Sequence, residues 1–163
     1  MNEKRRSLTS HPGILAGFVL FILVSIVSVS SAQLTLRGTA NPAINITTGT
    51  AGGSMTSVVN TTSQIRYTRQ SVIYKITVRT TCPTQAFTLQ VVATGVTRGV
   101  AAPAVTLTNG MSAVDFITSI PSAAGLTTAT PTLQYTASAT FAQGNSAELG
   151  NDVHTVTYTL QAQ

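Results

Sequence analysis

Residues 72–79 read VIYKITVR and alternate apolar with polar side chains. The apolar positions are Val72, Tyr74, Ile76 and Val78, and the polar positions between them are Lys75, Thr77 and Arg79. Successive side chains of a β-strand point to opposite faces of its sheet, so a period of two places all the apolar groups on one face. The stretch therefore predicts a strand whose apolar face is directed into a core while its other face meets water.

The same alternation recurs along residues 33–163. It covers residues 34–37, 44–47, 87–91, 133–141 and 155–161. Thr is frequent in these runs, and its β-branched side chain suits the half-exposed surface of a strand. No stretch shows the helical period with caps over the ~10 residues that a helix needs. Residues 33–163 are therefore predicted to form one all-β domain, a sandwich or small barrel of antiparallel strands.

Turn-forming residues between the runs suggest which strands pair. Asn109-Gly110 lies between two apolar runs, residues 105–107 and 114–117, and both turn residues tolerate positive φ. This arrangement predicts a β-hairpin. The last two runs, residues 133–141 and 153–162, are predicted to form a second antiparallel hairpin across the loop between them.

The composition excludes several classes of function. Charged residues make up 8% of the chain, against ~25% in an average protein. The formal net charge is +5, and Lys4, Arg5 and Arg6 stand together near the N-terminus. The rest of the chain lacks the dense Lys and Arg cluster that nucleic-acid binding requires. The single cysteine excludes an internal disulfide and a multi-thiolate zinc site, and no cofactor is expected.

The first 32 residues have the three-part pattern of an export signal. A polar, basic start precedes an uncharged apolar run, Ile14–Val29, and small residues follow at positions 30–32. These small residues predict signal-peptide cleavage between Ala32 and Gln33. The domain would then be released into the periplasm or to the cell surface.

The apolar run leaves a second interpretation open. It is longer than the ~7–15 residues of a signal-peptide core and slightly shorter than the ~17–25 residues that span a bilayer. With residues 30–32 included, residues 14–32 are long enough to remain as an uncleaved helical membrane anchor. Because basic residues resist translocation, residues 33–163 face the periplasm in both cases.

Side chains suited to catalysis or metal binding are scarce in residues 33–163. The carboxylates are Asp115, Glu148 and Asp152. We interpret the loop that carries Glu148 and Asp152 as a solvated turn, and His154 as a surface residue of the last strand. Cys82 is interpreted as a buried thiol, with an intermolecular disulfide as the alternative. No catalytic, metal-binding or cofactor-binding residue is predicted, and the chain is not expected to be an enzyme.

A basic cluster with aromatic neighbours suggests an alternative binding function. It comprises Arg66, Arg69, Lys75 and Arg79, with Tyr67 and Tyr74 among them. Basic side chains beside aromatic rings bind acidic glycans or lipid headgroups. The same charges also keep a sheet face soluble and discourage edge pairing. The absence of Trp makes a glycan-binding module the weaker interpretation.

The two ends of the domain resemble a known kind of subunit. The start reads QLTLRGT over residues 33–39, and the end reads HTVTYTLQA over residues 154–162. Both are similar to the first and closing strands of bacterial exported pilin-like β-sandwiches, including spore coat protein U-like subunits. Gly150 matches the glycine that opens the closing strand of chaperone–usher pilins, whereas Ala162 stands where those pilins have a tyrosine. The resemblance implies an immunoglobulin-like β-sandwich used for assembly.

These observations predict a non-catalytic, exported module with a structural or interaction role. Its partners would be other copies of itself or other envelope proteins, joined by strand addition at a sheet edge. The candidate assembly residues are Leu34 and Leu36 in the first strand and Val156, Tyr158 and Leu160 in the last. The alternative is a membrane-anchored accessory subunit of a membrane complex, held in the membrane by residues 14–32.

Overall fold

The computed structural model describes residues 33–46, 55–69, 72–122, 127–140 and 152–163. All regular elements in these residues are β-strands. They are β1 (Gln33–Gly38), β2 (Val58–Arg69), β3 (Tyr74–Thr81), β4 (Thr88–Thr94), β5 (Val100–Ala101), β6 (Val105–Leu107), β7 (Val114–Ile120), β8 (Thr127–Ala129), β9 (Thr132–Ser138) and β10 (Thr155–Ala162). The described segments contain no helix with the length and apolarity to cross a membrane. The predicted signal peptide or anchor, residues 1–32, lies outside the described residues.

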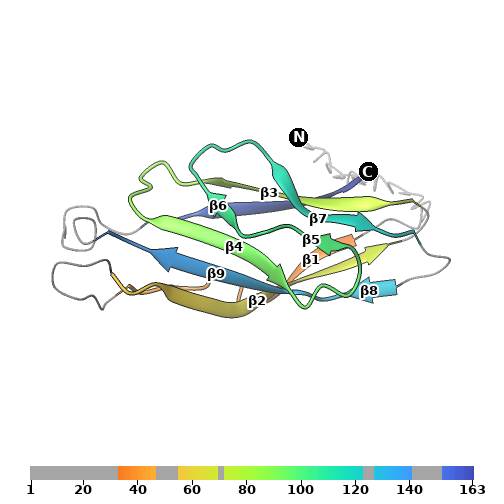
Figure 1. Ribbon diagram of the computed structural model, residues 1–163, viewed down its shortest axis with the longest axis horizontal. Helices are drawn as coiled ribbons and strands as arrows, with labels where there is room; N and C mark the ends of the chain where they lie inside the picture. Colours follow the sequence, from red (N-terminus) through yellow and green to blue (C-terminus); the bar gives the residue numbers. More distant parts are fainter. Residues whose placement is uncertain (1–32, 47–54, 70–71, 123–126, 141–151) are drawn as a thin grey trace, which may run out of the picture.

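The strands form two antiparallel sheets that pack face to face (Figure 1). The larger sheet has the order β1-β2-β9-β4-β6, and β8 pairs with β2 beyond the end of β9. The smaller sheet has the order β10-β3-β7-β5. The prediction of an all-β, antiparallel, sandwich-like fold is therefore confirmed for the described residues. Most connections cross from one sheet to the other, so strands adjacent in sequence seldom pair.

The alternating stretch around Ile76 forms β3, which lies between β10 and β7 in the smaller sheet. Ile76 and Val78 have no exposed surface, and Tyr74 is half-buried against the same core. Val156 and Leu160 of β10 pack against this core as well. The inward face predicted from the two-residue period is confirmed for Tyr74, Ile76 and Val78, whereas Val72 precedes the strand and is 44% exposed.

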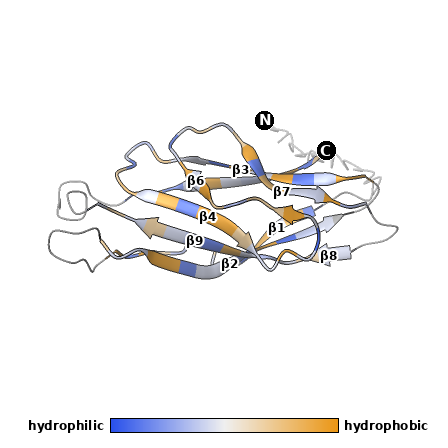
Figure 2. Ribbon diagram, in the orientation of Figure 1, coloured by the Kyte–Doolittle hydropathy of each residue, from blue (hydrophilic) through white to orange (hydrophobic). Residues whose placement is uncertain are grey.

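The larger sheet supplies the other half of the core. Its fully buried apolar side chains are Ile65, Tyr67, Val91, Leu107 and Leu133. Hydrophobic and hydrophilic bands alternate along β4, as expected for a strand with one buried face (Figure 2). In β7 a bulge opposite Ile76 and Thr77 allows two consecutive residues, Phe116 and Ile117, to be fully buried. Each such side chain contributes ~1.5–3 kcal/mol by leaving water.

Two segments differ from the strands that alternation predicts. The longest strand, β2, is not apparent from the sequence, because its first half reads VVNTTSQ and is mostly polar. Residues 44–46 are irregular, although a strand is predicted over 44–47. Ile44 still packs against the core. The nearby Pro42 has a fixed φ and no N–H to donate to a ladder, which favours the irregular path.

The hairpin predicted around Asn109-Gly110 is wrong, although the turn itself forms. The N–H of Met111 donates to the carbonyl of Thr108 at 3.0 Å, and Gly110 has a φ of 70°. However, β6 before the turn pairs with β4, whereas β7 after it pairs with β3 in the other sheet. The Asn109 side chain accepts the N–H of Cys82 at 2.8 Å, which fixes the turn at the end of β3. The chain therefore crosses the ~10 Å between the sheets instead of folding back.

The second predicted hairpin is also wrong, because β9 and β10 lie in different sheets. β9 is placed between β2 and β4, whereas β10 is the edge strand beside β3. The connection between them is long enough to cross the sandwich, and turn residues specify a bend without specifying the partner strand. The two strands meet across the core, where the hydroxyls of Tyr135 and Tyr158 are 2.9 Å apart.

Candidate functional site

Four strands form the edges of the two sheets, and their lengths differ. β1 and β10 have 6 and 8 residues, whereas β6 and β5 have 3 and 2. β1 contacts β10, so the two long edge strands run along the same side of the sandwich. An edge strand offers unpaired N–H and C=O groups to a further strand, and short edge strands limit such pairing. We call the long side the β1–β10 edge and treat it as the candidate assembly site.

The predicted assembly residues lie on the β1–β10 edge. Those that are half-buried against the core of their own domain are Leu34, Val156, Tyr158 and Leu160. Leu36 differs, because 45% of its surface is exposed. Its cross-strand partner is Ile65, which is buried between the sheets, so Leu36 faces the margin of the same interior. Four of the five residues thus complete their own sandwich, and Leu36 leaves nearly half of its surface exposed.

β10 is held to its own domain through the core. The Tyr158 ring lies 5.4 Å from the Phe116 ring, measured between centroids, and its hydroxyl meets that of Tyr135 on the opposite sheet. Burial raises the pKa of both tyrosine hydroxyls above the ordinary range. At Tyr158 the neighbouring hydroxyl of Tyr135 raises the pKa further. Both therefore remain protonated and hydrogen-bonded at neutral pH.

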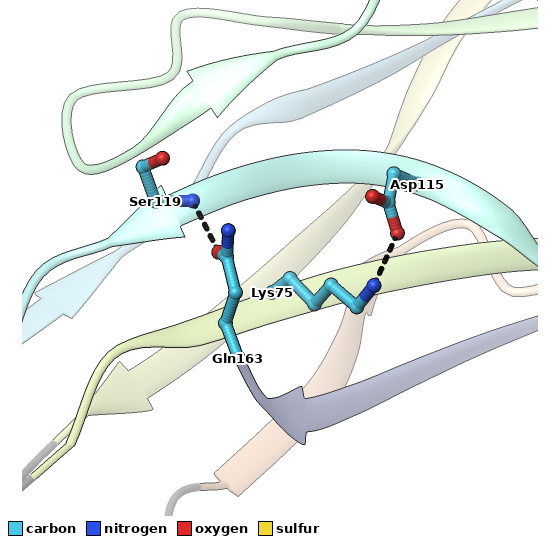
Figure 3. A network of polar contacts seen from close by, with 4 residues as sticks. All are labelled: Lys75, Asp115, Ser119 and Gln163. Carbon is cyan, nitrogen blue, oxygen red and sulfur yellow. Dashed lines mark hydrogen bonds and ion pairs between the residues drawn. The ribbon is translucent and has the colours of Figure 1, made fainter.

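Gln163 fastens the end of β10 across the smaller sheet (Figure 3). Its N–H donates to the carbonyl of Ile73, and its side-chain oxygen accepts the N–H of Ser119, both at 2.9 Å. Nearby, Lys75 Nζ lies 2.8 Å from Asp115 Oδ1 and joins β3 to β7. An ion pair this exposed contributes only ~0.2–1 kcal/mol. The attachment of β10 at this end therefore consists of one backbone and one side-chain hydrogen bond of Gln163.

β1 is attached mainly through its ladder with β2. Of its six residues, only Leu34 is half-buried, and the others are exposed. After the strand, the N–H of Thr39 donates to the carbonyl of Thr62 at 3.0 Å, and its carbonyl accepts the Ser63 hydroxyl at 2.6 Å. Separating β1 from β2 therefore exposes less apolar surface than separating β10 from β3.

Gly38 allows the end of β1 to approach β2 closely. Its φ is 70°, in the left-handed region that other L-residues rarely adopt. A Cβ at this position would overlap the carbonyl oxygen of Thr62. Any other residue here would push the end of β1 away from its partner strand.

The basic cluster predicted from the sequence does not form one surface. Arg66 is exposed between two buried residues of β2, so it lies on the outer face of the larger sheet. Lys75 and Arg79 lie on the outer face of the smaller sheet. Tyr67 is 1% exposed, and its hydroxyl donates to the carbonyl of Arg98. The expected stripe is thus divided between opposite faces, and Tyr67 is not available as a binding platform.

Cys82, Asp152 and His154 meet at one end of the β3–β10 pair, and we call them the Cys82 cluster. The ladder pairs Thr81 with Thr155, so one further step in the same register places His154 opposite Cys82. Cys82 is a free, fully buried thiol, as predicted. Asp152 and His154 are half-buried, which corrects their interpretation as solvated turn and surface residue. The other predicted loop carboxylate, Glu148, lies outside the described residues.

Hydrogen bonds fix both half-buried members of the cluster. The Asp152 carboxylate accepts the N–H of Ala86 at 3.0 Å and that of Phe87 at 2.8 Å, and so anchors the connection between β3 and β4. His154 Nδ1 lies 3.3 Å from the hydroxyl of Thr80. Burial lowers the pKa of His154, and the charge of Asp152 partly offsets this effect. The imidazole is therefore neutral at neutral pH.

No sequence pattern points to the residues that hold β10 or to the approach of His154 to Cys82. Gln163 and Ser119 belong to no motif, and their contact depends on how β10 and β7 flank β3. His154 and Cys82 are distant in sequence and meet only through the β3–β10 register. Comparison with protein-family models, with curated proteins and with solved structures finds no match to the chain.

Proposed function

We propose that this chain is a non-catalytic, exported structural module that assembles by exchange of β1 between copies. The observation that carries the proposal is the contrast between the two long edge strands. β1 has one half-buried side chain, that of Leu34, whereas β10 packs three apolar side chains against the core and is fastened by Gln163. Exchange of an identical element between protomers is a low-cost route to assembly.

The exchanged strand would make the same contacts in the neighbouring copy as it makes in its own. A β1 that leaves its own β2 exposes a ladder edge and the contact site of Leu34. The β1 of the next copy fills both with the same backbone hydrogen bonds, and these bonds supply the affinity in strand addition. Leu36 adds exposed apolar surface at the margin of the core. Arg37 is the only charged side chain on β1, and charged side chains discourage strand pairing.

Export is the second part of the proposal. Signal-peptide cleavage between Ala32 and Gln33 would place the domain in the periplasm or at the cell surface. β1 occupies Gln33–Gly38, immediately after this position. Cleavage would therefore free the end of the strand that must leave its own sheet. N-terminal sequencing of the protein isolated from its native envelope tests this step, and retention of residues 1–32 contradicts it.

The domain is proposed to be immunoglobulin-like in its two-sheet architecture and in the order β1-β2-β9-β4 of its larger sheet. In an immunoglobulin domain the fifth strand lies beside the second, and the sixth lies beside the third. Here β9 lies between β2 and β4 as the fifth strand does, and β10 lies beside β3 as the sixth does, whereas β7 is an additional strand on the other side of β3. Repeated crossings between the sheets are typical of Greek-key sandwiches, including jelly rolls.

Removal of β1 provides the direct test of assembly. We expect the chain that begins at Gln33 to form oligomers in size-exclusion chromatography. Deletion of residues 33–40 should give a monomer whose circular dichroism still shows the folded sandwich, because only Leu34 leaves the core with β1. Deletion of Gln163 is the matched control, since it loosens β10 and should leave the oligomers intact. A monomer already present before the deletion would reject assembly through β1.

An anchored accessory subunit is the second candidate function. It is favoured by the pairing of β1 with β2 in the same chain over its whole length, since a self-contained domain does not need exchange. In this case residues 14–32 would stay in the membrane and the sandwich would face the periplasm. Extraction only by detergent, together with an intact mass that includes residues 1–32, would favour this function over exchange.

A further inference from the structure

We propose that the Cys82 cluster is a binding site for a late first-row divalent cation, with Zn²⁺ as the best match. Cys82, Asp152 and His154 each offer one ligand atom, and these atoms all lie within 4.8 Å of one another. The site is at the end of the β3–β10 pair and does not depend on the exchange of β1. Its test is therefore separate from that of the proposed function.

Strand register explains why the three side chains converge. Asp152 and His154 are two residues apart just before β10, so they point to the same side of the extended chain. Continuation of the β3–β10 register places Cys82 opposite His154 on that same side. The cluster thus lies where the β3–β10 ladder ends, with Cys82 directly after β3 and the other two residues directly before β10.

The donor set selects the class of cation. A thiolate, an imidazole and a carboxylate are the ligands of Zn²⁺ and related late transition metals, whereas Ca²⁺ and Mg²⁺ take oxygen ligands. In tetrahedral Zn²⁺ sites the ligand atoms are about 3.3–3.6 Å apart, given the usual metal–ligand bond lengths. Because the three ligand atoms lie within 4.8 Å of one another, closing to this spacing takes a shift of at most about 1.5 Å. Water would occupy the fourth position.

The surroundings orient the ligands as metal sites require. Asp152 is held by the N–H groups of Ala86 and Phe87, and Oδ1 keeps a lone pair free because it accepts one bond only. The Thr80 hydroxyl can donate to the carbonyl of Thr155 at 3.3 Å and accept from His154 Nδ1. Metal-bound histidines commonly donate their second ring N–H to such a partner.

Burial and charge also favour a cation over a substrate. Cys82 has no exposed surface, so its sulfur is out of reach of any substrate larger than a small ion. On binding, the thiol would lose its proton to solvent, and the thiolate and the Asp152 carboxylate would together neutralise the two positive charges.

Titration of the reduced full-length chain with Co²⁺ tests the proposal without any substitution. We expect a near-ultraviolet band from thiolate-to-Co²⁺ charge transfer, visible bands typical of tetrahedral Co²⁺, and saturation at one ion per chain. Addition of Zn²⁺ should remove both sets of bands, and Zn²⁺ should raise the melting temperature in a concentration-dependent manner. Absence of the charge-transfer band in the folded, reduced protein would overturn the proposal.

Substitutions then locate the site. Cys82→Ser should abolish the charge-transfer band, and Thr80→Val should weaken Co²⁺ binding about 10-fold by removing the partner of His154. Asp115→Asn is the matched control, because this carboxylate pairs with Lys75 on the outer face and should not affect binding. If Cys82→Ser does not fold, Asp152→Asn and His154→Asn replace it. Each of these variants should weaken Co²⁺ binding by about 10-fold or more. Binding that survives all ligand substitutions would refute the assignment.

Discussion

Ile76 and Thr77 are neighbours on β3 but face opposite sides of the smaller sheet. Ile76 has no exposed surface and lies in the core, so Ile76→Ala should destabilise the domain by ~2–5 kcal/mol through lost burial and the cavity left behind. Thr77 is 5% exposed but lies on the outer face, among polar neighbours. Thr77→Ala should therefore cost much less. Urea unfolding of both variants checks the order, and a reversed order would shift the register of β3 by one residue.

Tyr135 and Tyr158 should make the domain sensitive to alkaline pH. Burial raises the pKa of both hydroxyls in the folded state, whereas in the unfolded chain they ionise near the ordinary value of ~10. The unfolded state then loses protons that the folded state keeps. Stability is consequently unaffected below pH ~10 and falls above it by about 1.4 kcal/mol per pH unit for each tyrosine.

Replacement of both tyrosines by phenylalanine provides the measurement. The double variant should have nearly the same stability at pH 7, because both partners of the hydrogen bond are removed together. Its free energy of unfolding, followed by urea titration between pH 9 and pH 11.5 in steps of about 0.5, should decline less steeply than that of the original protein. Equal slopes would show that the two hydroxyls do not remain protonated in the folded state.

At the scale of elements, Gly38 and Gly95 form a matched pair for the attachment of β1. Both have a φ near 70°, but a Cβ at Gly95 meets no atom within 4 Å, whereas one at Gly38 overlaps the Thr62 carbonyl. Gly95→Ala should lower stability by about 1 kcal/mol from backbone strain alone. Gly38→Ala should do the same and also detach the end of β1. Faster hydrogen exchange at residues 34–38 in Gly38→Ala only is the expected result, and equal exchange in both variants contradicts it.

The elements also show how far the sequence predicts this fold. Alternation in β3 assigns each side chain to a face of the sheet. A strand can place its apolar residues on one face or the other, and only one of these two registers buries Ile76. Alternation does not identify which strand pairs with which. Asn109-Gly110 forms the expected turn, yet its Asn109 side chain bonds to Cys82 and directs the chain to the other sheet. Long-range contacts of this kind leave no local signal.

The candidate sites are likewise predicted only in part from the sequence. Leu34 lies on the predicted first strand with its side chain half-buried, as alternation suggests. The unequal attachment of β1 and β10 depends on Gln163 and on the aromatic contact of Tyr158, which require the three-dimensional arrangement. The Cys82 cluster depends on it too, since the two strands that carry its residues are distant in sequence.

For the whole molecule, the distribution of edges is the main determinant of how copies can meet. The side bordered by β5 and β6 offers strands of 2 and 3 residues, whereas the β1–β10 edge offers strands of 6 and 8. With only 8% charged residues, the chain has few groups that discourage strand pairing. Association is therefore expected along the β1–β10 edge, and the firm attachment of β10 leaves β1 as the strand that exchanges.

Disulfide trapping across the β1–β2 ladder tests whether β1 is exchanged between copies. Thr35 lies directly opposite Arg66, and both side chains are exposed on the outer face. Directly paired Cα atoms in an antiparallel ladder are ~4.5–5.5 Å apart, within the range that a disulfide spans. One preparation would carry Thr35→Cys and another Arg66→Cys, and the two would be mixed and oxidised. The buried Cys82 should not react.

Exchange of β1 between copies predicts a covalent dimer that contains one chain of each variant. A mixture of Thr35→Cys with Thr68→Cys, which is out of register because Thr68 pairs with Gln33, should give little product. Both substitutions in one chain should form an internal disulfide and so verify the cis pairing. A disulfide that forms only within the doubly substituted chain, with no dimer in the mixture of single variants, would contradict the account.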